Sequence, residues 1–221
     1  MTLWLTRIVP DTRSQYARRD LADAVGTHRR VMSLFPSDAG PDPRARFGVL
    51  FRGEDTPQGP HILVQSTHEP DTGRLPDGYG TALTRRLDAL MDAIRPGLTV
   101  HYRCVASPVR KPGATTRALY DLKAVVPLTG AAADEWWLRQ ADRSGLKPLT
   151  HRPAQPLDAA GGERRPRGSA PQRVRHARTQ FDGTAAIIDT DQLKTALLNG
   201  IGRGKAYGCG LLSIAPARQP Q

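Results

Sequence analysis

The sequence predicts an α+β fold made of two tandem ferredoxin-like (RRM-like) domains, each with the order β-α-β-β-α-β. A chain of 221 residues with 38% apolar residues is long enough to bury two small hydrophobic cores. In its first half, stretches with the apolar spacing of strands and of helices follow one another in that order. After a segment rich in proline and glycine, the same coarse order returns without any repeat of sequence, which indicates a second domain.

The first domain is expected to span residues 1–106. Its four strands are predicted at Leu3–Val9, Phe47–Arg52, Ile62–Ser66 and Leu98–Val105. Asp23 can cap a first helix at Ala24–Leu34, which Pro36 closes. A second helix is predicted from apolar residues that share one helical face, namely Leu83, Leu87, Leu90 and Ile94. The stretch Pro70–Gly80 is expected to be a loop.

Residues 107–117 contain two prolines and a glycine and are predicted to be a linker. The second domain is then expected to span residues 118–221. Its helices are predicted at Asp134–Arg143 and Asp191–Asn199. Its strands are predicted at Tyr120–Val126, Gly183–Ile188 and Gly210–Ala215, with two less regular ones at Lys147–His151 and Arg173–Gln180.

The charge balance indicates a polyanionic partner. Lysine and arginine outnumber aspartate and glutamate by 32 to 21, which gives a formal net charge of +11. The sequence pI is about 10.4. Such a balance favours binding to nucleic acid, although a merely basic soluble protein would show it too.

Neither a membrane segment, a metal nor a cofactor is expected. The first residues lack the features of a signal peptide and no apolar stretch is long enough to span a bilayer, so we expect a cytoplasmic protein. Cys104 and Cys209 lie far apart, and Cys104 falls in a strand-like run that suits a small core residue. The six histidines show no metal-ligand spacing.

Arginines concentrate in the irregular stretch His151–Gln180. It holds seven of them against two acidic residues, Asp158 and Glu163, and its middle is rich in glycine and proline. Two interpretations are open for this stretch. It is either a solvated basic loop or a basic hairpin that becomes ordered against an RNA stem.

The stretch Gly200–Gly210 holds five glycines, with Arg203, Lys205 and Tyr207 between them. Its spacing fits neither a P-loop nor the dinucleotide-binding fingerprint, so a nucleotide-binding enzyme is disfavoured. One interpretation is a helix C-cap followed by a turn. The other is a loop whose backbone approaches RNA closely while its basic and aromatic side chains contact phosphates and bases.

Taken together, several motifs resemble one family over nearly the whole chain. They are Arg18–Asp23 followed by His28-Arg29, then Arg46–Arg52, Leu63–Ser66, Phe181–Gly183 and the glycine-rich loop Gly200–Gly210. In this order they resemble the CasE (Cse3) family of CRISPR repeat-RNA-processing endoribonucleases, which belong to the Cascade complex. The resemblance implies a metal-independent enzyme that cuts precursor RNA in the repeat hairpin. The implied product ends are a 2′,3′-cyclic phosphate and a 5′-hydroxyl, and the implied partners are the repeat hairpin, the mature guide RNA that the protein retains and other Cascade subunits.

His28 is the candidate catalytic residue. Cleaving RNA without a metal requires deprotonation of the 2′-hydroxyl, protonation of the leaving 5′-oxygen and neutralisation of the phosphorane charge. His28 lies on the helix face that also carries Val25 and Met32, so it could instead be a satisfied core histidine. The resemblance aligns His28 with the catalytic histidine of the family. At Val25, however, members of the family commonly have a tyrosine, so a non-catalytic RNA-binding subunit is the alternative.

The candidate RNA-binding residues are basic side chains near His28, in the linker and in the arginine-rich stretch, together with the glycine-rich loop. Arg29 and Arg30 could equally be solvated helix residues. The full set is Arg29, Arg30, Arg103, Arg110, Lys111, Arg152, Arg164, Arg165, Arg167, Arg173, Arg175, Gly200, Gly202, Arg203, Gly204, Lys205, Tyr207 and Gly208.

Overall fold

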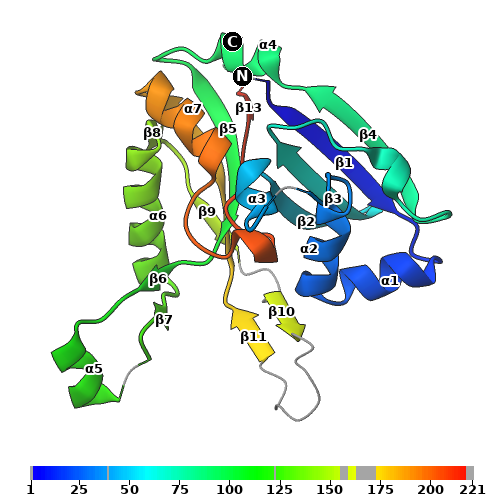
Figure 1. The fold of residues 1–221 in the computed structure, drawn as a ribbon. Helices are drawn as coiled ribbons and strands as arrows, with labels where there is room; N and C mark the ends of the chain where they lie inside the picture. The colour runs from blue at the N-terminus through cyan, green and yellow to red at the C-terminus, as the bar shows by residue number, and fades with distance from the viewer. Residues whose placement is uncertain (1, 39, 122, 155–158, 163–172, 218–221) are drawn as a thin grey trace.

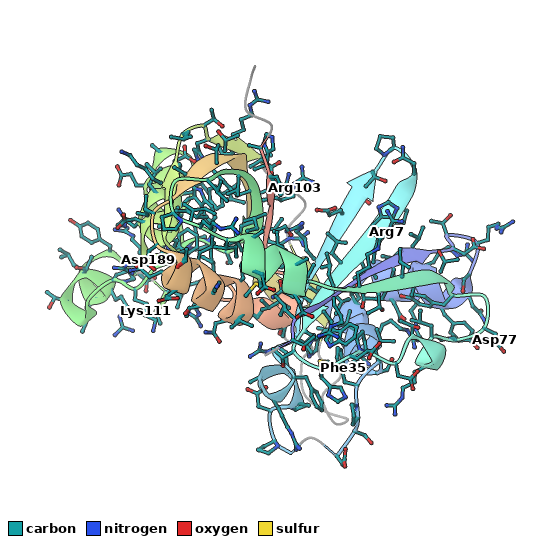
Figure 2. All side chains as sticks on the ribbon, turned by 90° about the horizontal axis from the view of Figure 1, so that it is seen from above. Arg7, Phe35, Asp77, Arg103, Lys111 and Asp189 are labelled. Carbon is teal, nitrogen blue, oxygen red and sulfur yellow. The ribbon has the colours of Figure 1, made fainter. Side chains whose placement is uncertain are left out.

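The structure is a computed structural model that describes residues 2–38, 40–121, 123–154, 159–162 and 173–217. It contains two antiparallel sheets, each covered by helices, which lie side by side (Figures 1 and 2). This arrangement confirms the α+β class and the two tandem ferredoxin-like domains. Candidate residues Arg164, Arg165 and Arg167 lie outside the described residues.

The first sheet has the ferredoxin-like strand order β2-β3-β1-β4. Its strands are β1 (Trp4–Pro10), β2 (Leu50–Thr56), β3 (Gly59–Ser66) and β4 (Gly80–Arg86). Helices α1 (Gln15–Leu21) and α2 (Ala24–Met32) pack on one face, where Ile8, Val31, Phe51 and Val64 share a core. Between β3 and β4 the chain forms the short 3-10 helix η1 (Thr72–Arg74) in place of the second α-helix of the standard fold.

The second sheet has the complete ferredoxin-like pattern, with strand order β13-β5-β12-β8. Its elements are β5 (Thr99–Ala106), α6 (Ala131–Arg143), β8 (Leu146–Pro148), β12 (Thr179–Ile187), α7 (Thr190–Asn199) and β13 (Leu212–Pro216). The short strand β9 (Arg152–Ala154) also pairs with β12. Trp137 and Phe181 stack at 4.9 Å between ring centroids in the core beneath the two helices.

Smaller elements complete the chain. Helix α3 (Pro43–Arg46) precedes β2, and α4 (Asp88–Ala93) connects the two sheets. Strands β6 (Val109–Arg110) and β7 (Val126–Pro127) pair at the base of an arm that carries α5 (Ala114–Tyr120) away from the rest of the fold (Figure 1). Strands β10 (Ala159–Gly162) and β11 (Arg173–His176) pair with each other, and the 3-10 helix η2 (Lys205–Tyr207) lies in the glycine-rich loop.

The helix predicted around Leu83–Ile94 is wrong in its first half. Residues 80–86 form strand β4, which pairs with β1 along its whole length, and only Asp88–Ala93 is helical. Leu83 is 49% exposed on the outer face of the sheet, so its helical spacing to Leu87 does not mark a buried stripe. Pairing with β1 outweighs the local pattern here, as tertiary context often does.

The predicted division after residue 106 cuts through the second sheet. The strand expected to complete the first domain, Leu98–Val105, corresponds to β5, which pairs with β12 and β13 instead. The predicted linker and the predicted strand Tyr120–Val126 are wrong too, because that part of the chain forms the arm of β6, α5 and β7. The single strand expected at Arg173–Gln180 is divided between β11 and β12, and β12 also includes most of the strand expected at Gly183–Ile188.

Arg52 joins the two domains. Its side chain is 2% exposed, and its guanidinium donates to the Leu211 carbonyl at 3.0 Å and to Ser213 Oγ at 3.1 Å. Glu54 lies 2.8 Å from the same guanidinium and balances its charge. Next to this contact, Gln65 of β3 donates to the Leu197 carbonyl of α7. Buried and paired on both sides of the boundary, Arg52 fixes the position of β2 against β13.

We expect Arg52→Met to lower the free energy of unfolding by about 3 kcal/mol, at the low end for breaking a buried ion pair because Glu54 keeps its contact with Arg103. Urea denaturation would measure the loss. The control is Arg7→Met, which changes an exposed arginine on β1 and should cost less than about 0.5 kcal/mol. Equal losses in the two variants would show that Arg52 does not hold the domains together.

Candidate active site and RNA-binding surface

Two side chains fix helix α2, which carries His28. Asp23 caps the helix as predicted, because its carboxylate accepts from the Val25 backbone N–H at 3.0 Å. Thr27 donates its hydroxyl to the carbonyl of Asp20, the penultimate residue of α1, and so ties the two helices together. His28 therefore projects from the second turn of a helix whose start is held by the chain on both sides.

The His28 ring lies against Phe51 of β2, with ring centroids 6.0 Å apart and an interplanar angle of 28°. Its Nδ1 atom is buried and has no hydrogen-bond partner within the part of the chain that the structure describes. A buried polar atom without a partner costs free energy unless a ligand or water pairs with it. The environment of His28 therefore differs from that of a satisfied core histidine and suits a group that acts on a substrate.

The electrostatic field around His28 is positive. Burial and the charge of Arg44, on α3, lower the pKa of His28 below its ordinary value of 6.5. Burial and the same Arg44 also lower the pKa of Lys205 in the glycine-rich loop. One arginine thus acts on both groups. A neutral imidazole at pH 7 is ready to accept a proton, and the neighbouring cations favour a negatively charged substrate.

The glycine-rich loop packs against the His28 site. Helix η2, which contains Lys205, lies against α2 and β2. The loop is closed on itself, because Ile201 N–H donates to the Gly210 carbonyl at 2.9 Å. Gly208 has φ of +76°, and a Cβ atom there would lie 3.4 Å from the ring of Phe51. Helix α7 does end at Gly200 as the C-cap interpretation requires, but the rest of the loop forms one wall of the candidate site.

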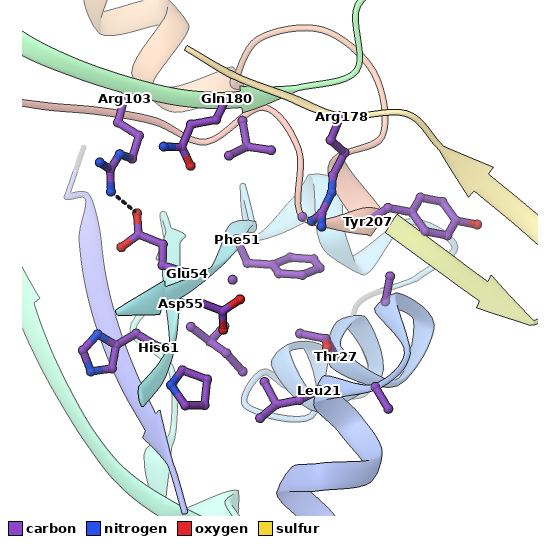
Figure 3. A pocket seen from close by; sticks show the side chains of 17 residues that line it. Leu21, Thr27, Phe51, Glu54, Asp55, His61, Arg103, Arg178, Gln180 and Tyr207 are labelled. Atoms are coloured by element: carbon purple, nitrogen blue, oxygen red, sulfur yellow. Dashed lines mark hydrogen bonds and ion pairs between the residues drawn. The ribbon is translucent and has the colours of Figure 1, made fainter. Parts of the chain in front are cut away.

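A cleft of about 680 Å³ opens beside the same wall (Figure 3). It lies between the corner of α1 and α2, the hairpin of β2 and β3, and the neighbouring strands β5 and β12. Phe51, Tyr207 and Gly208 line it, and Thr27, the residue before His28, lines it too. On the opposite side, Arg103 lies 3.4 Å from Glu54 and 2.8 Å from Asp182. The cleft and the His28 site are therefore neighbours.

The candidate residues divide into several groups. Arg29 is exposed next to His28. Arg30 is instead engaged within the fold, because it donates to Asp20 at 2.7 Å and its guanidinium lies over the Tyr79 ring. Arg103 is held by its two carboxylates at the cleft. The glycine-rich loop brings Gly200, Lys205, Tyr207 and Gly208 to the side of the first domain where α2 and β2 lie. Gly204 directly precedes this part of the loop, whereas Gly202 lies against Trp136 and Arg203 bridges to Ser107, both in the second domain.

Other candidate residues lie on separate elements. Arg110 and Lys111 are exposed at the base of the α5 arm, and Lys111 appears at the outer end of the second domain in Figure 2. Arg152 is exposed on β9. Arg173 and Arg175 lie on β11, whose partner β10 lies against α2. The pairing of β10 with β11 supports the interpretation of His151–Gln180 as a basic hairpin, and β10 lies beside the helix that carries His28.

Sequence reasoning missed Phe51 and Arg44 as parts of the site. Phe51 lies within the motif Arg46–Arg52 and Arg44 just before it, but a buried phenylalanine in a strand is indistinguishable from any other core residue. Arg44 had no signal at all, since it was one of many arginines. Both become visible only when α3, β2 and the glycine-rich loop are brought together. Cys104 is a fully buried free thiol, as expected.

The fold and the site define a double ferredoxin-like protein in which a helix-borne histidine faces a glycine-rich basic loop. A family model described as "CRISPR associated protein" matches residues 3–216. The chain is 31% identical to CRISPR-associated endoribonuclease Cse3 of Thermus thermophilus, over 97% of this chain and 100% of the relative. The chain belongs to the CasE (Cse3) family of CRISPR-associated proteins.

Two further comparisons agree with this assignment. The chain is 26% identical to the CRISPR system Cascade subunit CasE of Escherichia coli K12, over 90% of this chain and 96% of the relative. A solved structure of Thermus thermophilus Cse3, bound to an RNA representing a pre-cleavage complex, superposes with a TM-score of 0.78 at 28% identity. The match covers 98% of this chain and 100% of that one. No helix in the described ranges is long and apolar enough to cross a membrane.

We expect Gly208→Val to weaken the binding of a CRISPR repeat hairpin RNA by about tenfold or more, because a branched side chain at positive φ strains the loop beside Phe51. A fluorescence-anisotropy titration would measure the affinity and circular dichroism would monitor folding. The control is Gly113→Val on the α5 arm, where φ is ordinary and no atom lies within 4 Å of the added Cβ. Normal binding by Gly208→Val would show that the glycine is incidental.

Proposed function

We propose that this chain is the endoribonuclease that processes CRISPR precursor RNA by cutting in the repeat hairpin. The observation that carries the proposal is His28, whose buried Nδ1 lacks a partner among the described residues and whose pKa is lowered beside a basic glycine-rich loop. The relative from Thermus thermophilus, which is named an endoribonuclease, supports it. So does the fold match with a pre-cleavage RNA complex of that relative.

The chemistry needs no metal. The neutral imidazole of His28 accepts the proton of the 2′-hydroxyl, whose oxygen then attacks the adjacent phosphorus. The bond from phosphorus to the 5′-oxygen breaks, that oxygen takes up a proton from water as it leaves, and His28 later returns its proton to the solvent. The products carry a 2′,3′-cyclic phosphate and a 5′-hydroxyl. Lys205, Arg44 and Arg29 supply the positive charge that stabilises the phosphorane as it forms.

The alternative is a non-catalytic RNA-binding subunit of the same architecture. It is favoured by Val25, which lies one turn before His28 on α2 and offers no hydroxyl where relatives commonly have a tyrosine. Against it stands the buried Nδ1 atom of His28, which has no hydrogen-bond partner among the described residues, whereas a purely structural histidine would have one. We infer that His28 and the nearby cations are sufficient for cleavage without that hydroxyl.

The partners that we propose are the repeat hairpin, the mature guide RNA and other Cascade subunits. The name of the Escherichia coli relative, a Cascade subunit, supports the last of these. Retention of the product follows from the basic residues on the glycine-rich loop, β9 and β11, since phosphate contacts are the same before and after the cut. A location in the cytoplasm remains a prediction from the sequence.

We expect wild type to cleave repeat RNA in EDTA and His28→Ala to slow the single-turnover rate by roughly 10²–10⁴-fold. RNA affinity should change only a few fold, because a neutral imidazole contributes little to binding dominated by phosphates. The control His101→Ala removes an exposed histidine of β5 and should cleave normally. A 2′-deoxy substitution at the cut should block cleavage and spare binding. Full cleavage by His28→Ala would overturn the mechanism, and binding without any cleavage by wild type would favour the alternative.

We expect the single-turnover rate to rise with pH and to level off with a midpoint below 6.5, because the active form of His28 is the neutral one and its pKa is lowered. Arg44→Gln should move this midpoint upward, since loss of a nearby positive charge makes the imidazole easier to protonate. Arg46→Gln, on the exposed side of the same short helix, is the control and should leave the midpoint unchanged. An Arg44→Gln profile that matches wild type would contradict this arrangement.

A further inference from the structure

The cleft next to the His28 site has the character of a pocket for a nucleobase rather than for a phosphate. Arg103 and Arg178 line it together with Glu54 and Asp55, so its formal charges cancel. A phosphate-binding pocket would carry an excess of positive charge, as the surroundings of His28 and Lys205 do. Much of the remaining lining is apolar, with Leu21, Ala22, Ala24, Ile62 and Val105 among it.

The cleft also offers what a base needs for stacking and for hydrogen bonding. Tyr207 contributes an aromatic ring on which bases of any sequence can stack (Figure 3). Phe51, which is 2% exposed, contributes only a small part of its ring to the wall of the cleft. Gln180 donates one N–H of its amide to Asp182 at 2.8 Å, so its amide oxygen and its second N–H can be offered to a ligand. Glu54 is held in place by Arg52 and Arg103, which makes its carboxylate a fixed acceptor for N–H groups of a base.

The size and position of the cleft restrict its occupant. Its volume of about 680 Å³ lies in the range of small-molecule sites, and a base-paired stem cannot enter it. Thr27 directly precedes His28, and Tyr207 and Gly208 closely follow Lys205 in the chain. A nucleotide whose phosphate lies between His28 and Lys205 therefore has the cleft beside it.

We propose that this cleft takes the base of one unpaired nucleotide that flanks the scissile phosphate. The proposal rests on the function proposed above and adds a specificity pocket to it. With the base stacked on Tyr207 and hydrogen-bonded to Glu54 and Gln180, the ribose and phosphate of that nucleotide are oriented toward His28 before the reaction begins. The paired stem is then bound by the basic surface, and the position of the cut is set by the base in the cleft.

The test measures binding, with a 2′-deoxy substitution at the cut so that no RNA is cleaved. Synthetic CRISPR repeat hairpin RNAs are made with a single abasic position, scanned through the unpaired nucleotides on both sides of the stem. We expect one position to weaken wild-type binding by about tenfold, the effect of losing one stacked base. The scan identifies which flanking nucleotide enters the cleft.

Two variants then test whether that base lies in the cleft. Ala22→Trp places a large side chain at its rim, and Gln180→Ala removes a polar contact inside it. With Ala22→Trp, the abasic RNA should bind within about twofold of the intact RNA, because the tryptophan already excludes the base. With Gln180→Ala, the abasic penalty, meaning the loss of affinity caused by removing the base, should be smaller than with wild type. The control Ala89→Trp, on the exposed side of α4, should keep the full tenfold penalty.

An abasic penalty that is the same in wild type and in both cleft variants would overturn the proposal, as would a scan without any sensitive position. Cleavage of the unmodified ribose RNA by wild type is measured in parallel. If wild type cleaves the RNA but the cleft variants leave the abasic penalty unchanged, the pocket alone is refuted. If the cleft variants reduce the abasic penalty but wild type does not cleave, the pocket is supported and the enzymatic function is refuted.

Discussion

The alternation of side chains along β2 is the constraint on which the site depends. Phe51 points to the inner face, where it packs under α2 and supports the His28 ring. Arg52, the next residue, points to the outer face and is buried against β13 and β5 of the other domain. Because consecutive strand residues point to opposite faces, one short segment both supports His28 and holds the second domain in register. A shift by one residue would destroy both contacts at once.

This arrangement explains why the glycine-rich loop can act on a residue of the other domain. The loop is anchored to the second domain, since Gly210 N–H donates to the Val105 carbonyl at 2.7 Å. Its Gly208 nevertheless approaches Phe51 of the first. The Arg52 and Gln65 contacts keep that distance short, and Arg44 then influences both His28 and Lys205. The chemistry is therefore a property of the interface between the domains rather than of either domain.

The sequence was sufficient for the elements with a strong local pattern. The capped helix α2, the strands β1 and β3, and the helices α6 and α7 lie within a few residues of their predicted positions. The errors arose where pairing decides the structure. Thr99–Ala106 reads as a strand in either domain, and only its register with Phe181 and Leu212 assigns it to the second sheet. The role of the residues around His28 could be predicted from the family resemblance. The roles of Phe51 and Arg44 could be recognised only in the structure, because contacts between residues far apart in the chain produce no local sequence pattern.

The separation of the site along the chain has a consequence for biosynthesis. His28 and Phe51 belong to the first quarter of the sequence, and Lys205 and the partner strand β13 to its end. Because a chain emerges from the ribosome from its N-terminus, the first sheet can form while the glycine-rich loop has not yet been translated. A nascent chain thus carries the histidine without the wall that faces it. The proposed active site is assembled only when synthesis reaches the last strand, so prematurely terminated chains lack it.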